Sequence, residues 1–337
     1  MRVIRMYGPG DVRVEAAPEP RRSQGEALLR VRRVGLCGSD LNSWRGKNPM
    51  VLYPRIPGHE IAATIVEVDD EDPSMVAGMD VTLSPYSSCG HCSSCRNGRL
   101  NACTDNQTLG VQRDGALAEY ITVPVEKLFV AELGLEELCL VEPLTVGAHA
   151  VSRSRITEED IVAVLGCGGV GLGAVAASAF LGATTIALDI DDAKLEIARQ
   201  AGASHVLHTK REDVKTALAQ LTGNHGPDVI IEAIGLPETF RAAVELVSFT
   251  GRVTYIGYAK EPVAYETRLF VQKELDILGA RNAMPEDFRQ VIRMLEQHRF
   301  PVEAAISAIV PLEDTPEILS AWGAEPNRFA KIMITLD

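Results

Sequence analysis

The first 145 residues combine short apolar runs with frequent turn residues. Apolar and charged side chains alternate over residues 29–32, and further runs rich in β-forming residues follow at 61–68, 81–83 and 120–123. An alternation with a period of two is typical of strands that bury one face. Because Gly and Pro separate these short strands, the pattern predicts a β-barrel-like domain rather than a helical one.

The pattern changes at residue 161. Residues 161–165 form a continuous apolar run, which is typical of a strand buried on both faces of a parallel sheet. A Gly-rich turn and an Ala-rich helix over 170–181 follow, and Gly182 ends that helix. Strands and helices then alternate, with strands predicted at 185–188, 205–207, 229–231 and 253–256 and helices at 193–201, 213–221 and 239–247. This alternation predicts a doubly wound parallel sheet and the α/β fold class.

The last part of the chain contains elements that this second domain does not require. An amphipathic helix follows Met284 and Pro285, and a final strand is expected at 332–334. Each needs a partner for its apolar face, and we expect both to pack on the first domain. The predicted boundaries are therefore 1–145 together with 284–337 for the first domain, and 146–283 for the second.

The chain is strongly acidic, with a formal net charge of −13 over 337 residues. Such a surface repels nucleic-acid backbones and anionic lipid headgroups, so neither nucleic acid nor membrane is expected as a partner. No apolar run approaches the roughly 20 residues of a bilayer span. The N-terminal residues also lack the features of a signal peptide. We therefore expect a cytoplasmic location.

A glycine motif joins the first strand of the second domain to its first helix. Gly166, Gly168 and Gly171 have the G-x-G-x-x-G spacing, with Gly169 and Val170 between them. The first glycine permits a tight turn, the second lets the backbone approach a pyrophosphate, and the third allows close helix–strand packing. Free N–H groups at the helix start can bind phosphate. The motif in this setting predicts dinucleotide binding.

An acidic residue, Asp189, ends the second strand of the same domain. Its carboxylate can accept hydrogen bonds from both ribose hydroxyls, and Lys194 is expected to bind the ribose beside it. A 2′-phosphate would bring up to about two negative charges against this carboxylate. The next residue is Ile190 rather than an arginine that could pair with that phosphate. NAD is therefore expected as the cofactor instead of NADP.

Four cysteines lie close together in one short segment. Cys89, Cys92, Cys95 and Cys103 have the spacing C-x₂-C-x₂-C-x₇-C. Four thiolates suit tetrahedral Zn²⁺ and leave no open position, so they predict a structural zinc site. A disulfide pair would be unusual in a cytoplasmic protein. A zinc ribbon that reads nucleic acid is opposed by the net charge.

A second set of possible ligands comes from separate segments. Cys37 lies in the sequence Gly-Leu-Cys-Gly-Ser-Asp, and His59 and Glu60 follow Pro-Gly. One thiolate, one imidazole and one carboxylate would give three protein ligands and a vacancy, which is the architecture of a catalytic zinc. The alternative is that the cysteine and the histidine are ordinary core residues.

Together these motifs resemble those of the zinc-containing medium-chain dehydrogenase/reductase superfamily, the superfamily of the alcohol dehydrogenases. The resemblance runs essentially end to end, and it implies a GroES-like β-barrel catalytic domain and a Rossmann domain. The residues that carry it are 35–40, 58–60, 89–103, 114–120, 142–144 and 166–171.

Within that superfamily the chain resembles the sorbitol dehydrogenase-like branch. Glu142 stands where dehydrogenases of simple alcohols usually have a second cysteine, and residues 45–55 look like the loop of bacterial L-galactonate or L-gulonate 5-dehydrogenases. The resemblance implies hydride transfer between NAD and a secondary alcohol of a polyol or sugar acid. Alternatives are a simpler secondary alcohol or an amino alcohol, as in threonine dehydrogenase, a zinc-free quinone-reductase relative, or a non-catalytic sensor. The resemblance to this superfamily also implies that the protein is a homodimer or homotetramer.

The same resemblance implies roles for individual residues. Cys37, His59 and Glu60 would hold the catalytic zinc, and Glu142 would be an alternate or near ligand. A divalent zinc ion with the Cys37 thiolate, a neutral His59 and the Glu60 carboxylate has no net charge, so adding Glu142 makes the site negative and weakens the Lewis acid. The hydroxyl of Ser39 would pass the alcohol proton outward.

Other positions carry further expectations. A histidine often ends the proton relay in this superfamily, and the corresponding residue here is Asn42, which cannot act as a base. Arg281, after the predicted last strand of the sheet, is expected at the cofactor. Arg45, Lys47 and Arg55 are candidates for binding a substrate carboxylate.

Overall fold

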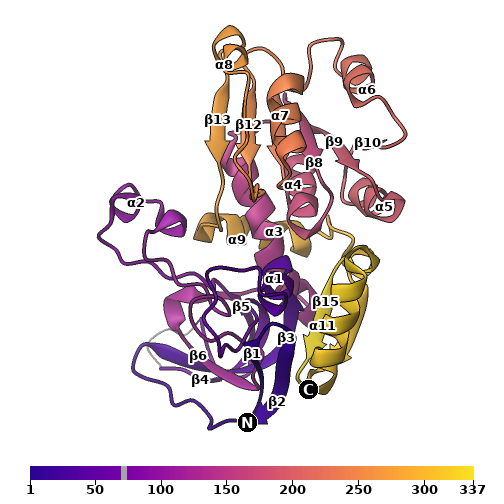
Figure 1. The fold of residues 1–337 in the computed structure, drawn as a ribbon. Coiled ribbons are helices and arrows are strands. Elements are labelled where there is room, and N and C mark those ends of the chain that lie inside the picture. Colours follow the sequence, from indigo (N-terminus) through magenta and orange to yellow (C-terminus); the bar gives the residue numbers. More distant parts are fainter. Residues whose placement is uncertain (70–73) are drawn as a thin grey trace. The chain divides into compact units, whose positions relative to one another are not determined.

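The computed structural model describes residues 1–69 and 74–337 and divides them into two compact units (Figure 1). Unit 1 contains residues 1–142 and 302–337, and unit 2 contains residues 143–301. No helix in the described part of the chain combines the length and the apolar character that a membrane crossing requires. The predicted α/β fold class, with one domain of short strands and a second domain with a doubly wound parallel sheet, is confirmed.

Unit 1 is built around one long strand, β3 (Glu26–Leu36), which buries alternate side chains over its first half. It lies inside a seven-stranded sheet, with β6 (Tyr120–Pro124) as a further partner of β3. In order across the sheet the strands are β14 (Ala308–Pro311), β15 (Ile332–Thr335), β3, β4 (Glu60–Glu67), β5 (Asp80–Leu83) and β7 (Leu128–Val130). The hairpin of β1 (Arg2–Gly8) and β2 (Asp11–Ala16) is a separate two-stranded sheet.

The helices of unit 1 are short. α1 (Gly38–Trp44) follows β3 directly and contacts α11 (Thr315–Ala324), while α2 (Ser93–Arg96) lies in the cysteine segment and α10 (Val302–Ala305) begins the C-terminal part. Because β15 pairs with β3, residues from both ends of the chain complete one sheet and share its apolar core.

Unit 2 contains a six-stranded parallel sheet. Its strands lie in the order β10 (His205–His208), β9 (Thr184–Asp189), β8 (Ile161–Leu165), β11 (Val229–Glu232), β12 (Arg252–Tyr255) and β13 (Asp276–Gly279). Counted along the chain this is the order 3-2-1-4-5-6 of a dinucleotide-binding fold. The switch point lies between β8 and β11, so ligands are expected at the carboxyl ends of these strands.

Helices flank this sheet. The helices of unit 2 are α4 (Gly169–Phe180), α5 (Asp192–Gln200), α6 (Val214–Leu221), α7 (Pro237–Leu246), α8 (Arg268–Gln272), α9 (Pro285–Glu296) and the second half of α3 (Leu135–Arg153). α4, α5 and α7 contact the strands directly, and Figure 1 shows them beside the sheet. The strands expected from the apolar runs are present within one or two residues of their predicted bounds.

The position of α9 differs from the expected domain boundaries. We expected residues 284–337 to belong to the first domain, but residues 284–301 group with unit 2. One buried carboxylate explains the difference. Asp287 accepts hydrogen bonds from His149 Nδ1 at 2.7 Å and from Ser152 Oγ at 2.9 Å, both on α3. Phe288 is fully buried beside it.

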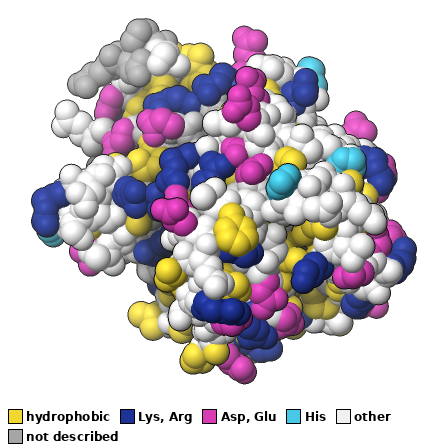
Figure 2. Space-filling model, turned by 90° about the horizontal axis from the view of Figure 1, so that it is seen from above, with side chains coloured by type: hydrophobic (Ala, Val, Ile, Leu, Met, Phe, Trp, Pro, Cys, Tyr) yellow, Lys and Arg dark blue, Asp and Glu magenta, His cyan; other side chains and the backbone are white. Residues whose placement is uncertain are grey.

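The charged surface is mixed. Figure 2 shows Lys and Arg side chains interspersed with Asp and Glu on one face of the molecule. Arg211 forms a two-point ion pair with Asp192, and Arg155 pairs with Asp276. Such exposed pairs contribute about 0–1 kcal/mol each, so they add little to the stability of the fold.

Helices α3 and α4 pack backbone against backbone through glycines. A Cβ atom on Gly173 would lie 2.6 Å from the carbonyl oxygen of Leu144, and one on Gly147 would lie 2.2 Å from the nitrogen of Ala174. Neither neighbour is a flexible side chain, so the helices would have to move apart. This close approach fixes α3 on the helix that begins in the glycine motif.

We therefore expect Gly173→Ala to lower the free energy of unfolding by about 2 kcal/mol, since overpacking outweighs the gain of about 1 kcal/mol in helix propensity. Denaturant unfolding followed by circular dichroism measures this change. Gly8→Ala is the control, because a Cβ there meets no atom within 4 Å. If Gly173→Ala were as stable as Gly8→Ala, this packing argument would be wrong.

Candidate metal and cofactor sites

The pairing of β3 with β4 brings the first set of candidate ligands together. β3 ends at Leu36, Cys37 is the N-cap of α1, and Glu60 opens β4 opposite Gly35. One ligand atom from each of Cys37, His59 and Glu60 lies within 4.8 Å of the others. Gly35 makes room for this arrangement, because a Cβ atom there would lie 2.0 Å from Glu60 Oε2.

The polar atoms of this cluster fit a cation. His59 is buried, and its Nδ1 has no hydrogen-bond partner among the described residues. Burial lowers the pKa of His59, but the Asp40 carboxylate and the Cys37 sulfur outweigh burial and raise this pKa well above its ordinary value. The site therefore attracts positive charge, and its sulfur, nitrogen and oxygen donors match the ligands that Zn²⁺ takes in proteins.

A buried lysine completes the cluster. Lys331 Nζ donates hydrogen bonds to both carboxylate oxygens of Glu60, each at 2.6 Å, and both side chains are buried. Burial lowers the pKa of Lys331, whereas Glu60 and Cys37 raise it, and the net shift is upward. Sequence reasoning missed this residue, because a lone lysine before an apolar run carries no chemical signal. Only the pairing of Ile332 with Leu36 places it beside Glu60.

Glu142 has a different partner. It lies on α3, is buried, and accepts a hydrogen bond from the hydroxyl of Tyr86. Burial raises the pKa of Glu142, and the charges of His59 and Glu60 also act on it. Burial and the Glu142 carboxylate together raise the pKa of Tyr86 well above its ordinary value. Tyr86 was also missed, because no sequence spacing connects it with Glu142, which lies 56 residues further along the chain.

Ser39 lies in the first turn of α1, two residues after Cys37. Its Oγ is buried and has no hydrogen-bond partner among the described residues. A buried hydroxyl without a partner is uncommon in folded proteins, and it indicates a place where a ligand atom or a water completes the site.

The four clustered cysteines surround one point. All four sulfurs lie within 4.8 Å of one another. The sulfurs of Cys92 and Cys95 are 3.5 Å apart. This distance is far longer than the roughly 2.05 Å of a disulfide bond, and all seven cysteines are free. The backbone N–H of Cys95 donates to Cys92 Sγ and lowers the pKa of that thiol to about 5. The cluster therefore fits a metal that binds four thiolates.

The glycine motif of unit 2 has the geometry that dinucleotide binding requires. Gly166 has a φ of 95°, and a Cβ atom on Gly171 would lie 1.8 Å from the Gly166 carbonyl oxygen. α4 begins at Gly169, and no side chain caps its first N–H groups. A Cβ atom on Gly168 would meet nothing within 4 Å, so the space in front of the helix is open. A phosphate fits there.

Asp189 lies at the carboxyl end of β9, next to this motif. Its carboxylate accepts hydrogen bonds from the backbone N–H groups of Cys167 and Ile190, each at 2.7 Å, and of Asp191 at 3.1 Å. Lys194 lies in the first turn of α5, which starts on the same side. Arg281 follows β13, three strands from β8, or about 14 Å across the sheet.

The three cations expected at a substrate carboxylate have different surroundings. Arg45 donates to the carbonyl oxygen of Gly323 at 2.6 Å, and Arg55 pairs with Asp114 at 3.1 Å. Lys47 is exposed, and its side chain forms no ion pair or hydrogen bond within the described residues. Two of the three cations are therefore already engaged by the protein.

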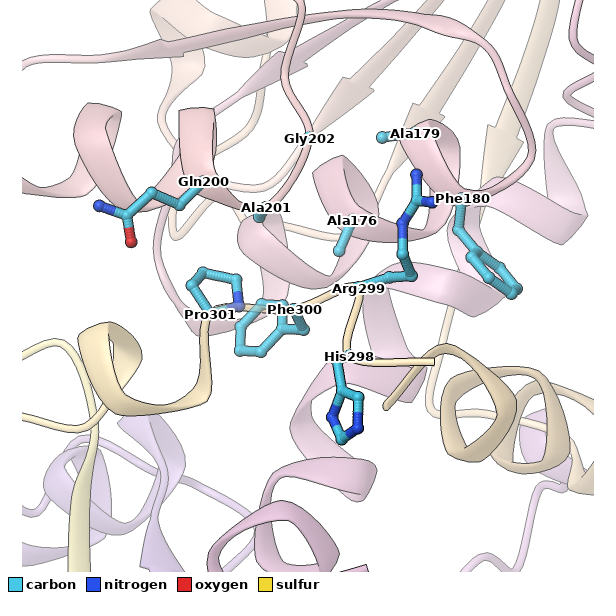
Figure 3. Close-up of a pocket in the computed structure, with 10 residues that line it drawn as sticks. All are labelled: Ala176, Ala179, Phe180, Gln200, Ala201, Gly202, His298, Arg299, Phe300 and Pro301. Atoms are coloured by element: carbon cyan, nitrogen blue, oxygen red, sulfur yellow. The ribbon is translucent and has the colours of Figure 1, made fainter. Parts of the chain in front are cut away.

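Unit 2 also contains a pocket of about 360 Å³ at the far end of α4 from the glycine motif. Its lining includes the ends of α4 and α5 and the residues that follow α9 (Figure 3). In Figure 3, Arg299 extends along α4 toward Ala179 and Phe180, while His298 points away. Three helices end here with negative partial charge, and Arg299 offsets it. None of the candidate site residues lines this pocket.

Comparison with known proteins gives consistent matches. The chain matches the family models for a zinc-binding dehydrogenase over residues 169–297 and for an alcohol dehydrogenase GroES-like domain over residues 23–133. An uncharacterized zinc-type alcohol dehydrogenase-like protein of Haemophilus influenzae is 32% identical, and the match covers 98% of each chain. L-galactonate-5-dehydrogenase of Escherichia coli is 32% identical over 87% of this chain and 86% of its own.

A solved structure extends this comparison. The crystal structure of an Escherichia coli protein, described as a short chain alcohol dehydrogenase and complexed with NADH, has a TM-score of 0.91 and 28% identity. The match covers 100% of this chain and 99% of the other.

The ion pair between Lys331 and Glu60 leads to a stability prediction. Lys331→Met leaves a buried carboxylate without its counter-charge, so we expect the free energy of unfolding to fall by about 3–5 kcal/mol. Adding Glu60→Gln to this variant should recover more than half of that loss. Denaturant unfolding of the two single variants and the double variant measures the coupling.

The control is Arg328→Gln, which breaks an exposed pair with Glu325 and should change stability by no more than about 1 kcal/mol. Equal stability losses for Lys331→Met and Arg328→Gln would show that the buried pair contributes no more to the free energy of unfolding than the exposed pair.

Proposed function

This chain belongs to the zinc-binding alcohol dehydrogenase family, and on that premise we propose that it transfers a hydride between NAD and a secondary hydroxyl of a polyol or sugar acid. One observation carries the substrate part of the proposal. Glu142, held by Tyr86, brings a second carboxylate to a site where dehydrogenases of simple alcohols usually have a cysteine. The similarity to L-galactonate-5-dehydrogenase over most of both chains supports the same substrate class.

Cys37 and His59, together with a carboxylate, would hold the catalytic zinc. Lys331 changes the charge balance that the sequence alone suggested. A divalent cation, the Cys37 thiolate, the two carboxylates of Glu60 and Glu142, and the Lys331 ammonium form a neutral set. Glu142 can therefore join the ligands without making the site negative. Since Lys331 bonds both oxygens of Glu60, we assign the exchangeable ligand position to Glu142.

Zinc in this position supplies Lewis acidity, which makes an alcohol proton easier to remove. The residues of the chain orient the substrate and move that proton. Ser39 Oγ has no hydrogen-bond partner in the described part of the chain, so it can accept a hydrogen bond from the reacting hydroxyl and pass the proton outward. Glu142 can accept a hydrogen bond from a second hydroxyl on the neighbouring carbon, which a simple alcohol lacks.

The cofactor would bind on unit 2. Its pyrophosphate would lie at the start of α4, where Gly168 leaves the space open. Three backbone N–H groups fix the Asp189 carboxylate, which would accept hydrogen bonds from the ribose hydroxyls, with Lys194 beside it. Arg281 is proposed as a further contact at the opposite end of the cofactor.

The first prediction from the proposed function concerns the cofactor. We expect kcat/KM to be at least about tenfold higher with NAD than with NADP, or about 1.4 kcal/mol, because Asp189 repels a 2′-phosphate. Steady-state kinetics with both cofactors measures this ratio. Asp189→Ser should reduce it, whereas Asp192→Asn, which alters an exposed neighbour, should not. Equal values for NAD and NADP in the unaltered enzyme would refute the role given to Asp189.

The second prediction concerns the substrate and tests the proposed function directly. In a dehydrogenase screen with NAD, five- or six-carbon polyols and aldonates should give higher kcat/KM than ethanol or other short primary alcohols. The physical reason is that only a polyhydroxylated substrate can bond both the metal site and Glu142. A preference for ethanol over every polyhydroxylated compound tested would contradict this assignment.

A further inference from the structure

A second group of possible metal ligands lies at the edge of the four-cysteine cluster. It consists of Cys89, His91 and Asp105, whose ligand atoms all lie within 4.8 Å of one another. Cys89 is half-buried, whereas His91 and Asp105 are exposed. Because Cys89 also belongs to the four-thiolate cluster, the two groups share one sulfur. A metal ion could therefore pass from one group to the other without leaving that ligand.

The imidazole of His91 is oriented by its own loop. Nδ1 lies 2.8 Å from the carbonyl oxygen of Cys89, and a hydrogen bond donated there leaves the lone pair of Nε2 for a metal. Metal-binding histidines commonly have this arrangement, in which the other ring nitrogen donates to a backbone carbonyl. Arg96 donates to the carbonyl oxygen of His91 at 2.7 Å and so holds the backbone in place.

Asp105 is fixed to the same cluster through its backbone. Its N–H group donates to Cys103 Sγ at 3.3 Å, which leaves its carboxylate exposed at the rim. The sulfurs deeper in the cluster are less accessible, since Cys95 and Cys103 are buried. A hydrated cation thus meets one oxygen, one nitrogen and the two half-buried sulfurs of Cys89 and Cys92 before it can reach the last two thiolates.

This order of ligands matches the chemistry of metal exchange. Hydrated Zn²⁺ accepts oxygen and nitrogen ligands readily, whereas four thiolates bind it only after water and the thiol protons have left. We propose that Cys89, His91 and Asp105 form a transient zinc site through which the metal enters and leaves the four-thiolate site. The inference rests on the zinc proposed for those four cysteines.

The test is the rate of metal exchange in the folded holoprotein. Zinc-loaded protein is mixed with excess Cd²⁺, and the thiolate-to-cadmium charge-transfer band reports exchange at the four cysteines. All variants carry Cys37→Ser, so that the other candidate zinc site contributes no thiolate. His91→Gln keeps a polar side chain but removes the ring nitrogen that would bind the metal. We expect it to slow exchange about tenfold, with the same final cadmium content.

Two further variants test the role of Asp105 and provide a control for general effects on the segment. Asp105→Asn should also slow exchange, and combining it with His91→Gln should slow it further. Arg99→Gln is the matched control, because it alters an exposed residue of the same segment that belongs to neither ligand group, and it should leave the rate unchanged. Circular dichroism and total zinc content establish that each variant is folded and loaded.

The outcomes separate this inference from the proposed function. If His91→Gln exchanges as fast as the Cys37→Ser parent while zinc content is normal, the transient site is refuted and the four-thiolate zinc stands. If the purified protein shows zinc content of less than one ion per four-cysteine cluster, the proposed structural zinc fails first. An equal slowing by Arg99→Gln would also overturn the inference, because it would indicate a general effect on the segment.

Discussion

The antiparallel pairing of β3 with β4 and β15 is the constraint on which the metal site depends. Gly35 of β3 pairs with Glu60, and Leu36 pairs with Ile332, so three distant segments meet where β3 ends. Cys37 then follows the strand, and Lys331 precedes its partner. A shift of one residue in either pairing would turn these side chains to the other face of the sheet.

This register also brings several charges into a buried space. Burying an unpaired carboxylate is costly, and Lys331 bonds both oxygens of Glu60. Glu142 accepts a hydrogen bond from the neutral Tyr86 hydroxyl instead. The two glutamates therefore differ in function although both are buried. One is matched within the protein, and the other is suited to a cation or to a hydroxyl of the substrate.

The parts that could be predicted from the sequence are local. The four cysteines lie within fifteen residues, and the glycine motif lies between a strand and a helix, so spacing alone describes them. Lys331 and Tyr86 could not be found in this way, because their partners are set by strand register and by a helix far away in the chain. α3 was not predicted either. It is apolar on several sides and contains Pro143, so it lacks the one-sided period of a surface helix.

The discontinuity of unit 1 has a consequence for biosynthesis. Residues 143–301 form a compact unit, and they are synthesised before β14, β15 and Lys331. During vectorial synthesis the parallel sheet can close while the N-terminal sheet still has an open edge along β3. Until the last strand arrives, Glu60 has no ammonium to neutralise it. The nascent chain therefore depends on residues translated after unit 2 both for the closure of that sheet and for the electroneutrality of its centre.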